Sequence, residues 1–550
     1  MRASSRTIAM AGIAAFALLA SACSPSGGSS ATTTTAKTGG AVTIRGCEPQ
    51  AELIGSNTTE VCGGNIIDAF TAKLVHYNPD NAAPEMDIAE SIDTSADFIT
   101  HTVKLKKGYK FQDGTEVKAK NFVDAWNWAA AFENGQANEY FFAPIAGYAD
   151  MGCQKWDDKK ENCVEKPTVK AMSGLAVVDD HTFTIKTDGP VANLAIRLGY
   201  SAFTPQPDSF FAAADKKEWA KKPIGAGPFK VSSFDKATAT VLEKFADYSG
   251  KYSAKVDKLT FKVYGDSNAA YNDVVANNLD LTDLIPADQL VGDVYKTQLK
   301  DRAAVKETLS FQALSFSPID PGLKDVRIRQ AISMAIDRQL INDKIFNNTR
   351  KPATGWAPPG VDGYKANVCG DACTFDAAAA KKLYDEAGGY KGTLELSVNG
   401  DGNHKPWADA FCNQLKTNLG LDCVVKVVAT FSDYRNQIRE RKLPGLFRAG
   451  WQADYPSIEN YLTPIYATGA SSNDTDYSNP QFDSLLKQAA AEGDTAKANA
   501  LYQQAEAMLA KDFPTMPMFY SSVAYGWSTK VDNVKMTPFG TFDLTSVTVK

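Results

Sequence analysis

Nine cysteines are the residues of this 550-residue chain whose type and spacing imply the most definite chemistry. Closely spaced cysteines serve either disulfide bonds or zinc. The spacing from Cys369 to Cys373, with His404 following, is compatible with zinc, but the whole chain has only four histidines. Apart from Cys23, the cysteines fall into close sequential pairs, and local disulfides within the pairs are the simplest prediction, although eight cysteines permit 105 pairings. These pairs are Cys47 and Cys62, Cys153 and Cys163, Cys369 and Cys373, and Cys412 and Cys423.

The N-terminus accounts for the remaining cysteine. Arg2 and Arg6 precede the apolar stretch Ile8–Ala20, which has the length of a secretory signal and is too short to span a membrane. Leu19–Cys23 resembles a bacterial lipobox, so we expect residues 1–22 to be a signal peptide and Cys23 to be lipidated. Ordinary signal cleavage is the alternative. Residues 23–40 are rich in Ser, Gly and Thr and predict a flexible tether, and export to an oxidising compartment favours disulfides over zinc.

The composition predicts a large globular protein. Hydrophobic residues make up 44% of the chain and charged residues 22%, which allows a sizeable core and excludes general disorder. The length suggests about three to four domain-sized units. The net charge is −6 and no run of Lys and Arg is present, so nothing favours binding to nucleic acid.

Hydrophobic periodicity predicts both strands and helices. Ile99–Leu105 and Leu394–Val398 alternate apolar and polar residues, which is typical of half-buried strands. Lys118–Phe132 places aromatic residues on one face at helical spacing. Such alternation of strands and helices indicates an α/β or α+β class. Further helices are expected after the capping residues Asp325, Asp376 and Asp494.

Three segments, in matching order, carry a family resemblance. They are Leu105–Thr115 (LKKGYKFQDGT), Pro223–Phe229 (PIGAGPF) and Asp325–Arg338 (DVRIRQAISMAIDR). Together they resemble motifs of bacterial ABC-importer solute-binding proteins of the peptide/nickel family (family 5), which includes the periplasmic oligopeptide- and dipeptide-binding proteins. Ala226 stands where that family usually has Thr, and Phe229 stands where it usually has Tyr.

The resemblance implies an α/β clamp of the periplasmic-binding-protein type, in its large three-domain form with mixed sheets. Ligand is expected in a cleft between two lobes that close about a hinge. The resemblance further implies a monomer without cofactor or metal, lipid-anchored outside the cell membrane, that delivers short peptides to membrane permease subunits. The implied lobe I comprises residues 41–71, 200–305 and 520–550, an extra domain comprises 72–199, and the other lobe comprises 306–519.

A receptor for many peptides must bind the groups that all peptides share. These are an ammonium, which a carboxylate can hold, a carboxylate, which Arg can hold, and a backbone, which a strand edge can pair with. The segment Arg448–Pro456 (RAGWQADYP) resembles a ligand-binding segment of the family. The resemblance implies that Asp454 holds the ammonium and Arg448 the carboxylate, while Trp451 and Tyr455 exclude water. The alternative for Asp454 is a turn residue that binds local amides.

The resemblance also implies several less specific assignments. Arg439 would be a second cation for the carboxylate. The backbone-pairing edge would lie at Val61, Cys62 and Gly63, braced by a Cys47–Cys62 disulfide. Trp407 and Tyr520 would line side-chain pockets, with the hydrophobic core as the alternative position for both.

An enzyme and a receptor for another kind of solute are the two alternative functions. Ser484–Lys487 and Lys37–Gly39 spell pieces of a penicillin-recognising serine site, but their order is wrong and no S-D-N occurs, so we expect no enzyme. A receptor for an oligosaccharide, an opine or a nickel chelate is the alternative within binding proteins. The scarcity of histidine argues against direct binding of a metal ion.

Overall fold

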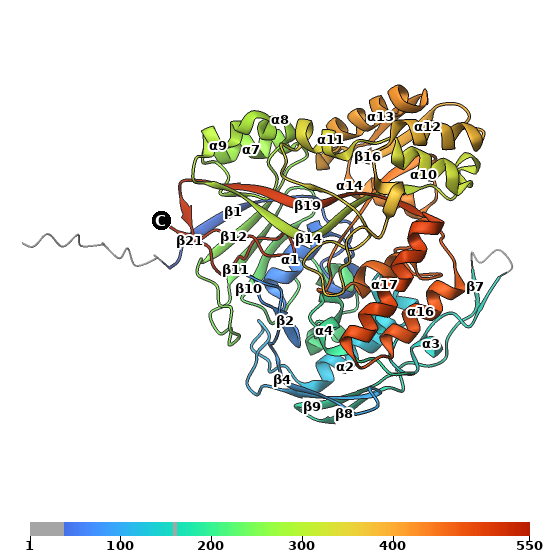
Figure 1. Ribbon diagram of the computed structural model, residues 1–550. Coiled ribbons are helices and arrows are strands. Elements are labelled where there is room, and N and C mark those ends of the chain that lie inside the picture. Colours follow the sequence, from blue (N-terminus) through green and yellow to red (C-terminus); the bar gives the residue numbers. More distant parts are fainter. Residues whose placement is uncertain (1–37, 158–161) are drawn as a thin grey trace, which may run out of the picture. The chain divides into compact units, whose positions relative to one another are not determined.

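The structure is a computed structural model that describes residues 38–157 and 162–550. The predicted signal peptide, the lipidation site Cys23 and most of the predicted tether lie outside these residues. Within them, no helix combines the length and the apolar character that crossing a bilayer requires. Strands and helices alternate along the chain, which confirms the predicted α/β class (Figure 1).

One mixed sheet of eleven strands gathers segments from distant parts of the chain. Its two long strands, β14 (Ala303–Phe316) and β19 (Thr515–Trp527), run side by side and antiparallel (Figure 1). The other strands are β10 (Phe229–Asp235), β11 (Ala239–Lys244), β12 (Lys258–Val263), β1 (Ala41–Gly46), β13 (Leu281–Thr282), β18 (Leu446–Gln452), β16 (Leu394–Asn399), β17 (Cys423–Val428) and β15 (Lys351–Pro352). Their order is β10-β11-β12-β1-β13-β19-β14-β18-β16-β17, with β15 beside β19. The pair β14 and β19 therefore joins two halves of the sheet.

A second sheet has four antiparallel strands in the order β4-β5-β9-β8, where β4 is Ala89–Thr94, β5 is Thr100–Leu105, β9 is Thr182–Lys186 and β8 is Leu175–Asp179. Helix α2 (Ala119–Ala130) packs against it, and the rings of Phe122 and Phe183 stack with centroids 5.7 Å apart. The strand and the helix predicted in this region are thus confirmed. The short elements nearby are β2 (Val75–Tyr77), β3 (Pro84–Met86), β6 (Lys155–Trp156), β7 (Cys163–Glu165), α3 (Tyr148–Met151), α4 (Leu194–Arg197), α5 (Asp208–Ala212) and α6 (Lys216–Trp219).

The aspartates expected as helix caps start their helices. Asp325, Asp376 and Asp494 accept hydrogen bonds from first-turn amides of α10 (Val326–Met334), α12 (Ala377–Glu386) and α17 (Thr495–Asp512). The remaining helices and strands are α1 (Val61–Phe70), α7 (Ser267–Val275), α8 (Ala287–Leu290), α9 (Val294–Leu299), α11 (Arg338–Ile345), α13 (Lys405–Leu419), α14 (Phe431–Arg439), α15 (Glu459–Tyr466), α16 (Pro480–Ala490), β20 (Val531–Asp532) and β21 (Thr548–Val549).

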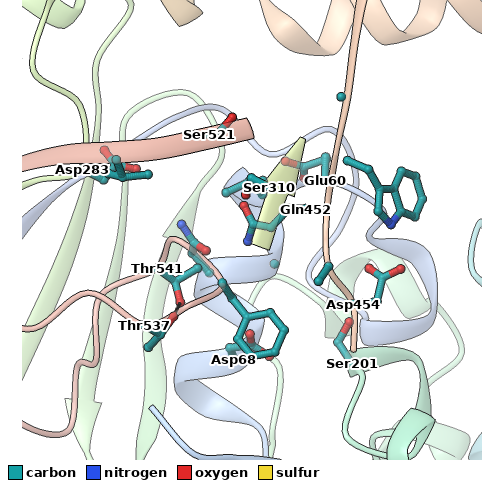
Figure 2. A pocket seen from close by; sticks show the side chains of 18 of the residues that line it. Glu60, Asp68, Ser201, Asp283, Ser310, Gln452, Asp454, Ser521, Thr537 and Thr541 are labelled. Atoms are coloured by element: carbon teal, nitrogen blue, oxygen red, sulfur yellow. Dashed lines mark hydrogen bonds between the residues drawn. The ribbon is translucent and has the colours of Figure 1, made fainter. Parts of the chain in front are cut away.

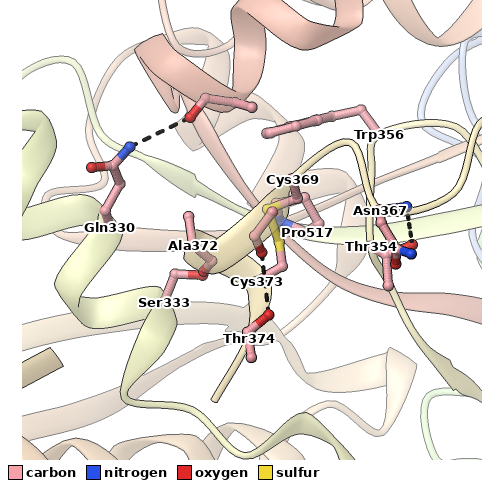
Figure 3. The surroundings of a disulfide bond; sticks show 12 residues. Gln330, Ser333, Thr354, Trp356, Asn367, Cys369, Ala372, Cys373, Thr374 and Pro517 are labelled. Atoms are coloured by element: carbon pink, nitrogen blue, oxygen red, sulfur yellow. Dashed lines mark hydrogen bonds between the residues drawn. A yellow bond between two sulfur atoms is a disulfide. The ribbon is translucent and has the colours of Figure 1, made fainter. Parts of the chain in front are cut away.

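Four disulfides join the two cysteines of each sequence pair, as the spacing predicts. Their sulfurs are therefore not available to zinc. The Cys369–Cys373 bridge closes a short turn that lies against α10 (Figure 3). There the Ser333 hydroxyl donates to the carbonyl of Ala372, so the bridge and this hydrogen bond hold the turn in place together.

Candidate ligand-binding site

A cavity of about 540 Å³ is lined by acidic, basic and amide side chains that could bind a ligand. Its wall is built from β18, from the start of α1, from β14 and from the C-terminal segment, which are hundreds of residues apart in sequence. The cavity therefore exists only in the folded chain. Figure 2 shows the side chains of Glu60, Asp68, Ser201, Asp283, Ser310, Gln452, Asp454, Ser521, Thr537 and Thr541 around it.

Asp454 lies in the cavity wall just beyond the end of β18. Asn460, in the first turn of α15, holds it: Asn460 Nδ2 donates to Asp454 Oδ2 at 2.8 Å, and the Asp454 amide donates to Asn460 Oδ1 at 2.8 Å. The same Oδ1 accepts from Trp451 Nε1 at 2.9 Å. One buried asparagine thus fixes both the carboxylate and the indole that the sequence pattern had brought together.

The electrostatic surroundings of Asp454 are those of a charge without a counter-ion. Burial raises the pKa of this carboxyl group to about 7. Hydrogen bonds from Asn460 and Tyr200 lower the pKa in part, and the charge of Glu459 raises it further. No ion pair of Asp454 with a cation occurs among the residues that the structure describes. A positively charged ligand group would therefore find an unneutralised acid here.

Tyr455 lies behind Asp454 and not in the cavity wall, where it was expected. Its ring is buried in the cluster that includes the core of the smaller sheet, and its hydroxyl hydrogen-bonds to Glu459. Glu459 in turn pairs with Arg197 at 3.5 Å, and both side chains are buried. Tyr455 therefore packs α15 against the region of residues 72–199, and its role in excluding water from Asp454 stays a prediction.

β18 has one edge that is not covered along part of its length. β14 pairs with it from Leu446 to Gln452, but on its other side β16 pairs only at Leu446 and Phe447. Over the described residues, no strand adjoins this second edge from Arg448 to Gln452.

The hydrogen-bonding direction along this edge follows from the neighbouring ladder. The amide of Ala453 donates to the carbonyl of Leu309 at 3.0 Å. Because antiparallel ladders alternate, the backbone groups of Arg448, Gly450 and Gln452 point away from β14. The Tyr434 hydroxyl already donates to the Arg448 carbonyl, so the groups that remain at the uncovered edge are those of Gly450 and Gln452. An extended ligand could therefore pair with them as an added strand.

Arg448 stands on β18 and lines the cavity, and its binding of a carboxylate stays a prediction. Its backbone carbonyl accepts from the Tyr434 hydroxyl at 2.5 Å, which holds the strand at this point. Its Nε is buried without a hydrogen-bond partner. Burial lowers the pKa of its guanidinium group, a direction expected when a cation lacks an adjacent anion.

Three further side chains adjoin Arg448, and the sequence pattern did not single them out for binding. Arg350, Gln312 and His404 also line the cavity, and Arg350 Nη1 donates to Gln312 Oε1 at 2.5 Å. Trp407 Nε1 donates to His404 Nδ1 at 3.2 Å, so the neutral ring carries its proton on Nε2. These residues come from three unrelated segments, and neither periodicity nor spacing indicates that they converge.

The segment from Glu60 to Gly63 is not the strand edge that was expected. It is the start of α1, because the Glu60 carboxylate accepts from the amides of Cys62 and Gly63 and so begins the helix. Val61 lines the cavity, whereas Cys62 and Gly63 do not. The strand edge that lies uncovered in this region is that of β18 instead.

The three remaining predicted residues lie outside the cavity wall. Arg439 is exposed on the last turn of α14, where its Nη2 donates to Thr59 Oγ1 at 3.1 Å. Trp407 is fully buried in the largest hydrophobic core, and Tyr520 belongs to the same core. The bulk of these two aromatic rings places them in the core rather than in a pocket wall, although Trp407 still supports His404.

Replacing Asn460 with alanine should destabilise the fold. Trp451 Nε1 and the Asp454 amide would both lose their acceptor in a buried position, which costs about 1–3 kcal/mol of the free energy of unfolding. Guanidinium titration measures this change. Asn413, exposed on α13, provides the control, because Asn413→Ala should change the value by less than about 0.5 kcal/mol. Equal effects of the two substitutions would show that Asn460 does not organise the site.

The chain is similar to known proteins over most of its length. The family model described as "Bacterial extracellular solute-binding proteins, family 5 Middle" matches residues 83–473. The oligopeptide-binding protein OppA of Bacillus subtilis is 26% identical over 488 residues, covering 86% of each chain. The periplasmic oligopeptide-binding protein OppA of Escherichia coli is 28% identical over 472 residues, covering 82% of each.

The fold has close counterparts among solved structures. The murein tripeptide binding protein MppA of Escherichia coli superposes with a TM-score of 0.81 at 22% identity, over 94% of this chain and 99% of that one. This likeness supports the fold alone, whereas the family model covers most of the chain. The family consists of solute-binding proteins and not of enzymes, in agreement with the absence of an ordered catalytic motif in the sequence. The chain belongs to the bacterial extracellular solute-binding proteins of family 5.

Proposed function

We propose that this protein is the receptor of an ABC importer and that its solute is a short peptide. The observation that carries the proposal is the layout of one cavity: an uncompensated carboxylate, Asp454, an uncompensated guanidinium, Arg448, and the uncovered edge of β18 between them. A peptide presents the complement of all three, namely an ammonium, a carboxylate and a backbone able to pair with a strand. The names of the oligopeptide-binding relatives support the same ligand class.

The spacing of the two charges suggests the peptide length. Asp454 lies six positions after Arg448 along nearly extended chain, which corresponds to about 20 Å. The two side chains occupy part of that span, and an extended peptide advances about 3.3–3.6 Å per residue. Peptides of about three to five residues would therefore reach from one charge to the other.

The proposed clamp has residues 41–71, 200–305 and 520–550 as one lobe, 306–519 as the other, and 72–199 as the extra domain. β14 and β19 cross between the lobes, and their ladder is interrupted between Glu307 and Phe311, where a hinge could bend. Contacts between the proposed parts would hold the closed form. They include the Arg197–Glu459 ion pair, the hydrogen bond from Arg439 to Thr59, and that from Gln50 Nε2 to Asn436 Oδ1 at 3.2 Å.

The cellular placement follows from the N-terminal sequence. We propose that Cys23 carries a lipid after signal cleavage, and that residues 23–40 tether a monomeric receptor to the outer face of the cell membrane. From there it would pass peptides to permease subunits. The family's extracellular character supports this placement.

Native mass spectrometry of the purified protein tests the ligand class. We expect co-purified masses that correspond to a series of short peptides, since a receptor bound to shared backbone and terminal groups accepts many side chains. A single oligosaccharide, opine or nickel-chelate mass would replace the peptide assignment with the corresponding solute.

A further inference from the structure

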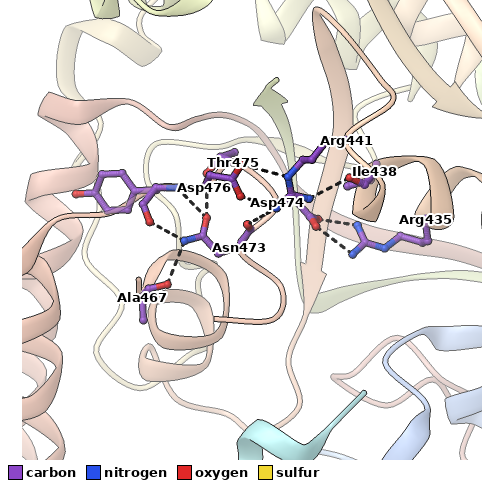
Figure 4. A network of polar contacts seen from close by, with 9 residues as sticks. Arg435, Ile438, Arg441, Ala467, Asn473, Asp474, Thr475 and Asp476 are labelled. Atoms are coloured by element: carbon purple, nitrogen blue, oxygen red, sulfur yellow. Dashed lines mark hydrogen bonds and ion pairs between the residues drawn. The ribbon is translucent and has the colours of Figure 1, made fainter. Parts of the chain in front are cut away.

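The arginines that line the cavity differ in how their charges are compensated. Two of the four form ion pairs: Arg45 with Asp283 at 2.8 Å, and Arg435 with Asp474 at 2.7 Å (Figure 4). Arg350 and Arg448 form no ion pair with any carboxylate in the described residues. The cavity therefore contains two positive charges that the protein leaves uncompensated.

These two charges lie close enough for Arg448 to lower the pKa of Arg350, and a buried amide, that of Gln312, lies beside both. Leu314 pairs with Arg448 and Gln312 with Gly450 across β14 and β18, which places the side chains of Arg448 and Gln312 on one face as diagonal neighbours. Gln312 is 4% exposed, its Oε1 accepts from Arg350, and its Nε2 has no partner. The site thus holds two cations and a free amide donor that points to no protein acceptor.

The surrounding groups do not neutralise the pair. Burial, with a smaller contribution from the charge of Arg448, lowers the pKa of Arg350 to about 10. Burial and both arginines keep the pKa of His404 well below its usual value, so this ring is neutral at pH 7. Asp401 favours the charged form of Arg448 but forms no ion pair with it, and its oxygens accept from Asn399 Nδ2 and the Phe431 amide.

We propose that the ligand brings two carboxylates to this end of the cavity, so that the preferred peptides end in Asp or Glu. The inference rests on the proposed peptide function. One terminal carboxylate would leave one buried guanidinium uncompensated, whereas a terminal carboxylate on Arg448 and a side-chain carboxylate on Arg350 neutralise both. The free Nε2 of Gln312 and Nε2–H of His404 supply additional donors to these oxygens.

Matched peptides test this preference without altering the protein. Alanine peptides of three, four and five residues that end in Glu are compared by calorimetric titration with the same peptides ending in Gln. At the length that fits best, the Glu peptide should bind at least about tenfold more tightly, because charge-assisted hydrogen bonds are stronger than neutral ones. Equal affinities at every length overturn the inference and leave the peptide function standing. If neither series binds, the peptide function fails as well.

Variants at one position then identify the residue responsible. Arg350→Met should bring the Glu-to-Gln affinity ratio close to one, and Arg350→Lys, which keeps the charge, should retain a preference for Glu. Lys351→Met is the matched control, because Lys351 is exposed on β15 and pairs with Glu307 at 2.6 Å. An unchanged ratio in a folded Arg350→Met protein, as judged by its melting temperature, overturns the assignment to Arg350.

Discussion

Replacing Asp454 with asparagine is expected to cost about 2–5 kcal/mol of binding free energy for peptides with a free amino end, or roughly 30- to 4,000-fold in Kd. The substitution keeps the size of the side chain and its position beside Asn460 while it removes the charge. The lost quantity is a charge-assisted hydrogen bond in a site from which protein groups exclude much of the water. Calorimetric titration with a free tetrapeptide measures it.

An N-acetylated form of the same peptide separates this role from a structural one. Acetylation removes the ammonium, so Asp454→Asn should weaken its binding much less. Asp68→Asn is the matched protein control, because Asp68 lines the same cavity but is already paired with Lys73 at 2.5 Å. A loss of the same size for free and acetylated peptides would remove Asp454 from the recognition of the amino end.

Local patterns were sufficient for the elements that depend on neighbouring residues. Alternation marked β5 and β16, and the side chains of Asp325, Asp376 and Asp494 bind amides within their own first turns. Both effects act over a few residues of chain. The joining of β1, β14 and β19 in one sheet depends on contacts across hundreds of residues, and only the family resemblance indicated it.

The residues of the candidate site likewise differ in whether they lie near one another in sequence. Asp454, Arg448 and Trp451 belong to one segment at the edge of β18, so a motif could identify them together. Arg350 and Gln312 reach the same cavity from separate elements, which no spacing in the sequence reveals.

The prediction of a strand edge around Val61 was wrong for a local reason. The carboxylate of Glu60 accepts hydrogen bonds from the amides of Cys62 and Gly63, which favours the start of a helix over an extended strand. A Glu three residues before a Gly is not a capping pattern that stands out in sequence. Trp407 and Tyr520 lie in the hydrophobic core, which the sequence had left open as the alternative to a position in a pocket wall.

The affinity for peptides is expected to depend on pH through Asp454. Its pKa in the unliganded protein is raised from 3.8 to about 7, chiefly by burial, so below pH 7 the empty site holds a proton. That proton must leave before an ammonium group can bind, and Kd should therefore rise about tenfold for each pH unit below 7. At pH 5 binding should be roughly 100-fold weaker than at its maximum. Above about pH 8 the peptide's own amino group loses its proton, and affinity falls again.

Ionisation of Asp454 should also make the free energy of unfolding depend on pH, in the opposite direction to the ligand affinity. The folded, empty protein binds this proton more tightly than the unfolded chain does, so Asp454 makes the free energy of unfolding fall as pH rises from about 4 to about 7. Ligand affinity rises over that interval because the ammonium replaces the proton as the partner of the carboxylate. Titrations between pH 5 and 9 measure the first effect, and urea unfolding without ligand measures the second. Asp454→Asn should remove the contribution of this group to both, and a wild-type affinity that stays constant from pH 5 to 7 would exclude a protonated Asp454 in the empty site.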